Sequence, residues 1–127
     1  MGNETTPRSV VNLDEVLASI PEPWMPHTVA VVNDYDVRVA KVEGEFIPHR
    51  HPETDELFLV LKGGLTLRME AGDVHLGPGD TFVVPKGTEH QPVAEPGTQI
   101  LMVEPSETPN TGDQPGERTQ ARRVVGD

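Results

Sequence analysis

The chain has 127 residues, enough for one domain of ordinary size. Its 10 basic and 21 acidic residues give a net charge of −11, which disfavours nucleic acid and anionic membrane surfaces as partners. It has no cysteine, which excludes disulfides and thiolate metal ligands, and no apolar stretch approaches the roughly 18 residues of a membrane span. We therefore expect a soluble, cytoplasmic protein of one domain.

Residues 1–27 are predicted to form an N-terminal segment with one short helix. Asn12 is a suitable N-cap and Glu15 follows it at capping-box spacing. Apolar residues then recur at helical intervals, at Leu13, Val16, Leu17 and Ile20. Prolines at 21, 23 and 26 end this helix, and Trp24 between them is expected to anchor the segment against a larger body.

Residues 28–104 are predicted to form a β-barrel. Short Val- and Leu-rich runs alternate with Gly, Pro, Asn and Asp turns at intervals of roughly ten residues, which favours a sandwich or small barrel. The expected strands, at least seven, span 28–32, 37–43, 56–62, 65–70, 74–76, 81–84 and 98–104. Gly63-Gly64 provides the positive φ of a tight two-residue hairpin.

The stretch Leu57 to Leu61 is apolar at every position, as expected for a strand covered on both faces. A symmetric homodimer is the simplest cover for the outer face. Residues 105–127, rich in Pro, Thr, Gly and charge, are predicted to be a tail without periodic structure, either flexible or pinned along the barrel surface.

Histidines and carboxylates gather where one metal ion could be bound. On a strand, His49 and His51 point to the same side with their Cα atoms about 6.5 Å apart. After a bend, either Asp55 or Glu56 offers a carboxylate, and His90 offers a third imidazole after another turn. Three nitrogens and one oxygen suit a divalent Fe, Mn, Ni, Cu or Zn ion.

This spacing resembles both sequence motifs of the cupin superfamily. The first motif is present as His49-Arg50-His51, four residues, Glu56, six residues and Gly63, and the second runs from Gly79 through Pro85 and Gly87 to His90. Together the motifs span residues 44–94. The chain departs from the pattern in two places: Gly44 lies one residue too close to His49, and Ala94 replaces a frequent Asn.

The resemblance implies an all-β fold, a double-stranded β-helix or jelly-roll barrel, with the ligands inside one open end. It also implies the ligand set His49, His51, Glu56 and His90, because the family carries Glu rather than Asp at this position. His27 and His75 are expected to be structural residues. Arg38 and Lys41 are candidates to bind an acidic substrate, although a solvated strand face explains them equally well.

The predicted substrate pocket is mainly apolar. Ile47 shares the face of His49 and His51, Phe58 and Val60 share that of Glu56, and Met69 projects from a neighbouring strand. This lining suits a small, partly apolar molecule oriented by the metal. No catalytic residue beyond the metal ligands is assigned.

Three functions are compatible with such a barrel. A metal-dependent, dioxygenase-like enzyme is slightly favoured, because four protein ligands leave two positions on a six-coordinate ion. A phosphosugar isomerase would need a basic cluster for phosphate, which the scattered Arg and Lys residues do not supply. The third function is a non-catalytic accessory or small-molecule-binding protein.

Overall fold

A computed structural model describes residues 9–126 of the chain. One short helix precedes seven strands in sequence. The elements are α1 (Leu13–Ser19), β1 (His27–Val32), β2 (Tyr35–Glu45), β3 (Glu56–Lys62), β4 (Leu65–Arg68), β5 (Val74–Leu76), β6 (Thr81–Val84) and β7 (Gln91–Pro105). The predicted all-β class with an N-terminal helix is confirmed.

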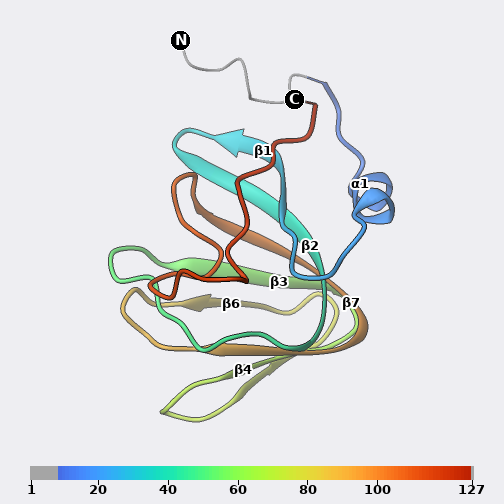
Figure 1. Cartoon of the computed structure of the whole chain (residues 1–127). Coiled ribbons are helices and arrows are strands. Elements are labelled where there is room, and N and C mark those ends of the chain that lie inside the picture. The colour runs from blue at the N-terminus through green and yellow to red at the C-terminus, as the bar shows by residue number, and fades with distance from the viewer. Residues whose placement is uncertain (1–8, 127) are drawn as a thin grey trace.

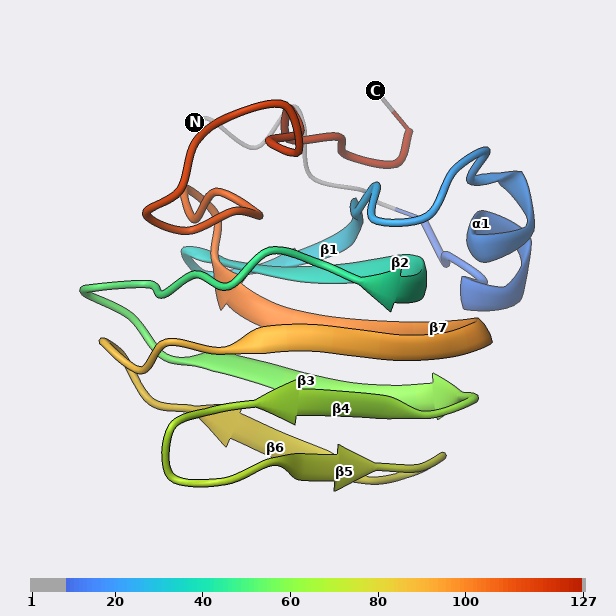
Figure 2. The same cartoon turned by 60° about the horizontal axis from the view of Figure 1, so that its bottom comes forward.

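The strands form two layers that share β7. One layer has the order β1-β2-β7-β3-β6, and in the other β4 pairs with both β5 and β7, all antiparallel (Figures 1 and 2). Residues 91–94 of β7 pair with β4, whereas residues 99–103 pair with β3. Gly97, with φ +81°, lies between these two halves and allows the strand to bend. The result is a jelly-roll barrel.

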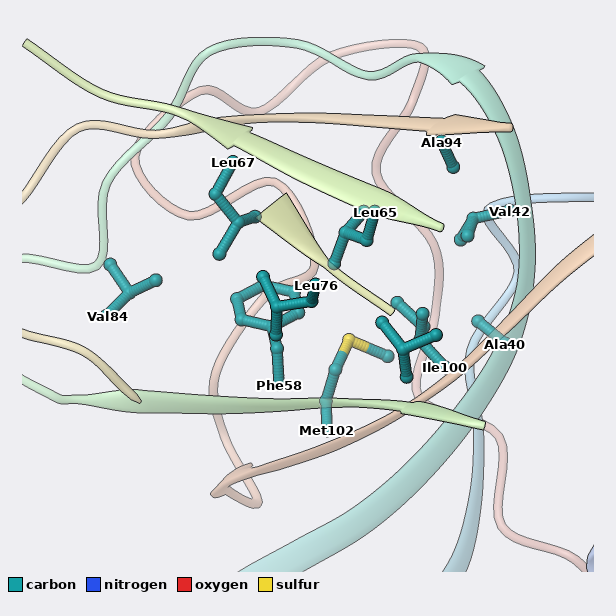
Figure 3. Packing of buried hydrophobic residues seen from close by; sticks show 11 residues of the cluster. Ala40, Val42, Phe58, Leu65, Leu67, Leu76, Val84, Ala94, Ile100 and Met102 are labelled. Atoms are coloured by element: carbon teal, nitrogen blue, oxygen red, sulfur yellow. The ribbon is translucent and has the colours of Figure 1, made fainter. Parts of the chain in front are cut away.

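The core fills the space between the two layers (Figure 3). Phe58 of β3 and Met102 of β7 point toward Leu67 of β4 and Leu76 of β5 in the opposite layer. These side chains are at most 7% exposed. Burying each of them contributes about 1.5–3 kcal/mol to folding.

Helix α1 covers the outer face of β1 and β2. The Asn12 side chain accepts a hydrogen bond from the Glu15 N–H at 3.0 Å, which caps the helix as predicted. Buried Val16 and Leu17 of the helix pack in one apolar cluster with Val29 of β1 and Val39 of β2. Among residues 9–126, no helix combines the length and apolar character needed to span a membrane.

Two sequence predictions about the turns are wrong. Gly63-Gly64 does not close a hairpin, because β3 pairs with β6 and β7 whereas β4 pairs with β5 and β7. The two glycines instead carry the chain from one layer to the other, and a Cβ at Gly63 would collide with Thr98. The strand expected at 98–104 begins already at Gln91, since residues 95–97 bend a continuous strand instead of ending one.

The C-terminal segment, residues 106–126, folds back along β1 and β2 at one end of the barrel (Figure 2). The Thr28 N–H donates a hydrogen bond to the Arg123 carbonyl at 2.7 Å, and the Val125 N–H donates to the Thr28 carbonyl at 2.9 Å. Residues 1–8 of the predicted N-terminal segment, and Asp127 of the predicted tail, lie outside the described residues.

Candidate metal centre

The structure brings the four predicted ligand residues together at one end of the barrel. His49 and His51 follow β2, Glu56 begins β3, and His90 immediately precedes β7. All four are buried, with exposed fractions between 0% for His90 and 5% for His51 and Glu56. One potential ligand atom from each lies within 4.8 Å of the others.

Backbone hydrogen bonds fix the two histidine segments against each other. His49 and His90 form an isolated antiparallel bridge, with N–H to carbonyl distances of 3.0 and 2.9 Å. The His51 carbonyl accepts from the Gly87 N–H at 2.9 Å, and Gly87 has a φ of +78° in the preceding turn. The imidazoles are therefore held by the main chain of both segments.

Backbone carbonyls also select the tautomer of two imidazoles. Nδ1 of His49 donates to the Ile47 carbonyl at 2.9 Å, and Nδ1 of His90 donates to the Thr88 carbonyl at 3.0 Å. A proton on Nδ1 leaves a lone pair on Nε2, the arrangement that metal-binding histidines adopt.

The atoms facing the centre of the cluster lack hydrogen-bond partners. Nε2 of His51 and Nε2 of His90 lie 3.0 and 3.4 Å from Glu56 Oε1. Within the described part of the chain, none of these three buried atoms has a hydrogen-bond partner. Lone pairs of imidazole nitrogens and a carboxylate oxygen repel one another unless a proton or a metal ion lies between them. The donor set therefore fits a metal ion.

The charges of the cluster also suit a cation. Burial and the neighbouring His90 lower the pKa of His49 to about 4, so its imidazole is neutral near pH 7. Burial opposes ionisation of Glu56, but its contacts with His51 and His90 outweigh this and hold its pKa well below the usual value. Neutral imidazole and ionised carboxylate are the metal-binding forms.

The rival carboxylate, Asp55, lies outside the cluster. Its side chain is exposed, and Oδ1 accepts a hydrogen bond from the Lys86 N–H at 2.8 Å. Asp55 therefore caps the turn before His90, while Glu56 points into the barrel.

Arg38 is not available to an acidic substrate, so that candidate role is corrected. The side chain is buried, and its guanidinium makes five hydrogen bonds within the protein. The acceptors are the carboxylates of Asp36 and Glu104 and the carbonyls of Ser106 and Thr108. The other candidate, Lys41, is half-buried and lies outside the cavity beside the cluster.

Glu104 is a buried carboxyl beside the cluster that the sequence analysis missed. Burial and the charge of Glu56 raise its pKa well above the usual value, with Arg38 opposing them. Glu104 lies two residues after Met102 and four after Ile100, and all three therefore point to the same side of strand β7. Because Ile100 and Met102 are apolar and face the barrel interior, this alternation could have placed Glu104 in the interior as well.

A small cavity of about 40 Å³ lies beside His49 and Glu56. Its walls are mainly apolar, with Trp24, Phe46, Ile100 and Met102 among them. Phe58 lines this cavity, whereas the other predicted pocket residues, Ile47, Val60 and Met69, do not.

Local geometry explains these three corrections. Residues 46–48 are not in a strand, so alternation fails there and Phe46 is buried in place of Ile47. Val60 lies one step further along β3, fully buried in the closed core. Strand β4 ends at Arg68, so Met69 belongs to the following turn and packs against the core from its edge.

The C-terminal segment packs against the ligand segment and contributes Asn110 to the cavity wall. Asp113 donates its N–H to the Arg50 carbonyl at 3.0 Å, and the Arg50 N–H donates to Asp113 Oδ1 at 3.1 Å. The Arg118 guanidinium lies 5.0 Å from the centroid of the Phe46 ring, which itself stacks on Trp24. Of the two alternatives that the sequence left open for this segment, the structure shows the one in which it is pinned along the barrel.

The remaining histidines have local structural contacts away from the cluster. His75 is exposed, with Nδ1 2.9 Å from Thr66 Oγ1, and Nδ1 of His27 is 3.1 Å from the Met25 carbonyl. Their surroundings agree with structural roles.

Comparison with known proteins identifies similar chains among both sequences and solved structures. The chain is 35% identical over 94 residues to the uncharacterized protein YdbB of Bacillus subtilis, covering 73% of this chain and 83% of that protein. A cupin-2 domain protein from Shewanella frigidimarina is 38% identical, with a TM-score of 0.73, and the match covers 76% of this chain and 94% of that one.

A more distant match is hydroquinone 1,2-dioxygenase from Sphingomonas sp. TTNP3, solved with 4-hydroxybenzoate bound. It is 22% identical with a TM-score of 0.68, covering 76% of this chain and 32% of that one. At this identity the likeness concerns the fold alone. The sequence profile of the cupin domain matches residues 35–104, the barrel that carries the four clustered residues. The chain therefore belongs to the cupin family.

Proposed function

We propose that His49, His51, Glu56 and His90 bind one divalent transition metal, and that the protein is a metal-dependent enzyme acting on a small molecule. The observation that carries the proposal is the convergence of their ligand atoms within 4.8 Å, three of them buried and without hydrogen-bond partners in the described residues. A dioxygenase-like reaction is the favoured class. When bound, the ion would use the positions left free by four protein ligands to bind and polarise substrate and dioxygen.

The protein's own residues would prepare the site in three ways. The carbonyls of Ile47 and Thr88 orient two imidazoles, so that their Nε2 atoms are free to bind the ion. The apolar walls, including Phe58 and Met102, exclude water and favour a ligand with apolar surface. The C-terminal segment places the Arg118 guanidinium over the ring of Phe46, a residue of the cavity wall.

Removal of individual imidazoles tests the ligand set. His49→Ala and His90→Ala should lose most of the bound metal while keeping the β-sheet signal in circular dichroism, because each deletes one donor from the inner surface of the barrel. The measurement is elemental analysis of protein purified without chelators, and His75→Ala is the matched control because His75 is exposed and outside the cluster. Full metal retention in both cluster variants would contradict the proposal.

A non-catalytic accessory or binding function is the second candidate, favoured by the small size of the cavity, about 40 Å³. Iron as the native metal, together with oxygen uptake on a candidate substrate, would support the oxygenase. Zinc or nickel without turnover would support the accessory role. A phosphosugar isomerase is disfavoured because the Arg38 guanidinium is already used by internal acceptors.

A homodimer and a cytoplasmic location are also part of the proposal. The outer face of the larger sheet is apolar where β7, β3 and β6 lie side by side, with Val103, Leu57 and Val83 in one paired row. Val83, which is 46% exposed, lies in this apolar row. A second copy of the chain would cover this row.

A further inference from the structure

Glu104 interacts electrostatically with Glu56 of the cluster, and one of its carboxyl oxygens is not engaged by any hydrogen bond among the described residues. The residue is 2% exposed and lines the cavity beside His49 and Glu56. Oε2 accepts a hydrogen bond from Arg38 Nη1 at 2.7 Å, whereas the buried Oε1 has no hydrogen-bond partner in the described residues. Buried oxygens of this kind are rare and call for a partner.

Arg38 fixes the position of this carboxyl. Besides its bond to Glu104, the guanidinium donates to Asp36 at 3.3 Å, to the Ser106 carbonyl at 3.0 Å and to the Thr108 carbonyl at 2.9 Å. Because its donors are all engaged, the guanidinium cannot swing to another partner. The Glu104 carboxyl is therefore held in place through Oε2, while Oε1 has no hydrogen-bond partner in the described residues.

The other polar groups in the cavity wall already have partners. The Trp24 indole N–H donates to the Glu43 carbonyl at 2.9 Å. The Asn110 amide donates to the carbonyl of residue 118 and accepts from the N–H of residue 120. Among the described wall residues outside the four-residue cluster, Oε1 of Glu104 is the buried side-chain polar atom left without a partner.

We propose that Glu104 is the hydrogen-bonding contact for the molecule that binds the metal, and that Arg38 is its positioning residue. Glu104 and Glu56 lie beside each other on β7 and β3, next to the register pair Val103 and Leu57. Side chains at such neighbouring positions are about 5 Å apart, so one small ligand can contact both Glu104 and an ion bound by Glu56.

The chemical class of the ligand follows from its contact with Glu104, its contact with the metal ion and the apolar walls of the cavity. A hydroxyl group is the best partner for Oε1, because it can either donate or accept a hydrogen bond. Apolar walls disfavour a charged ligand, and the small volume of about 40 Å³ restricts the ligand to a few non-hydrogen atoms. The ligand is thus a small uncharged molecule with a hydroxyl next to its metal-binding oxygen. This inference rests on the proposed metal site.

The test compares hydroxyacetone with acetone, which lacks the hydroxyl, on the Co²⁺-loaded protein. Binding is followed by the visible absorption of Co²⁺, after the Co²⁺ content of each variant has been measured separately. Wild type should bind hydroxyacetone at least about tenfold more tightly, since a buried group left without its partner penalises the analogue. Glu104→Leu should abolish this preference, and Glu104→Gln, which keeps a hydrogen-bonding group, should retain part of it.

Glu95→Gln is the matched control, because Glu95 is an exposed carboxylate on the same strand. It should keep the full preference. Should Glu104→Leu not fold, crystals of the Co²⁺-loaded wild type with hydroxyacetone decide, by whether the ligand hydroxyl lies within hydrogen-bond distance of Oε1. Equal binding of the two probes by wild type, or an unchanged preference in Glu104→Leu, would overturn the inference. Failure to bind Co²⁺ would instead refute the proposed metal site.

Discussion

His49 shows how a buried side chain is prepared for a metal by its surroundings. The residue is 3% exposed, and its Nδ1 is engaged by the Ile47 carbonyl. Burial and the neighbouring His90 lower its pKa from 6.5 to about 4. Protonation therefore does not compete with metal binding at this imidazole until the solution is well below neutral pH.

The lowered pKa predicts a specific pH dependence of the metal-free protein. Between pH 6.5 and about 4, the unfolded chain takes up a proton at this position that the folded chain does not. The contribution of His49 to the free energy of unfolding should therefore fall as the pH drops through this window, by at most about 1.4 kcal/mol per pH unit. Above pH 6.5 it should be constant.

Two measurements check this prediction. An NMR titration of the His49 ring should give a midpoint near pH 4, and urea unfolding of wild type should lose more stability between pH 6.5 and 4 than His49→Asn does. Comparison of the two proteins cancels contributions that other groups make equally to both. A ring that titrates near 6.5 would contradict the buried environment described above.

The sequence analysis found the clustered residues but not Arg38 and Glu104. Motif spacing identifies His49 and His90 because ligand positions are fixed by strand and turn lengths, which the sequence displays directly. Charged residues in strands usually face solvent, so the sequence predicts Arg38 either as a contact for an acidic substrate or as part of a solvated strand face. Its burial depends on acceptors in residues 106–108, far away in sequence, and no local pattern reveals that partnership.

At the level of elements, the C-terminal segment contributes more to the structure around the metal centre than its composition suggests. It has no apolar periodicity, so the sequence predicts a tail and leaves open whether it is flexible or pinned along the barrel. In the structure, Gly112 packs directly on the ligand segment: a Cβ at this position would meet the Arg50 carbonyl oxygen and lie 2.9 Å from His49 Cδ2. Its φ is +57°, which also favours glycine. Such contacts come from tertiary packing and cannot be inferred from local sequence.

Gly112→Ala should therefore displace the segment from the metal centre. We expect a loss of about 1–3 kcal/mol in the free energy of unfolding, from steric overlap and backbone strain. Removal of bound metal by EDTA should also become faster, because the cover over His49 is loosened. Chemical denaturation and the rate of metal release measure the two effects.

Gly116→Ala provides the control within the same segment. A Cβ at Gly116 would have no neighbour within 4 Å, so this change should alter stability by no more than about 0.5 kcal/mol. Equal behaviour of the two variants would show that the segment does not depend on its contact with His49 and Arg50.

For the whole molecule, the proposed dimer depends on the apolar outer face of the larger sheet. The sequence predicted a covered β3, and the structure places Leu57 and Leu59 half-buried on the outside while Phe58 and Val60 fill the core. The barrel could be predicted because alternation and turn spacing are local. The surface that a second copy would cover in the proposed dimer could not be predicted, because it depends on how three strands align.

Leu59→Arg should convert the proposed dimer into a monomer. A charge at this half-buried outer position would have to be desolvated against the partner, whereas in the monomer it stays in water. Size-exclusion chromatography with light scattering gives the mass, and circular dichroism checks the fold. Val32→Lys, at a 58% exposed position at the end of β1, should remain dimeric. A monomeric wild type would rule out the dimer.

The bridge between His49 and His90 has a consequence for unfolding kinetics. These residues are separated by about 40 positions in sequence, and the intervening chain contains β3 to β6. A metal ion bound by both histidines would act as a reversible cross-link that closes this loop. The ion would have to dissociate before the two layers of the barrel could separate. Metal dissociation would then be the slow step of unfolding. The fraction of protein with bound metal would therefore set the lifetime of the native state as well as the activity.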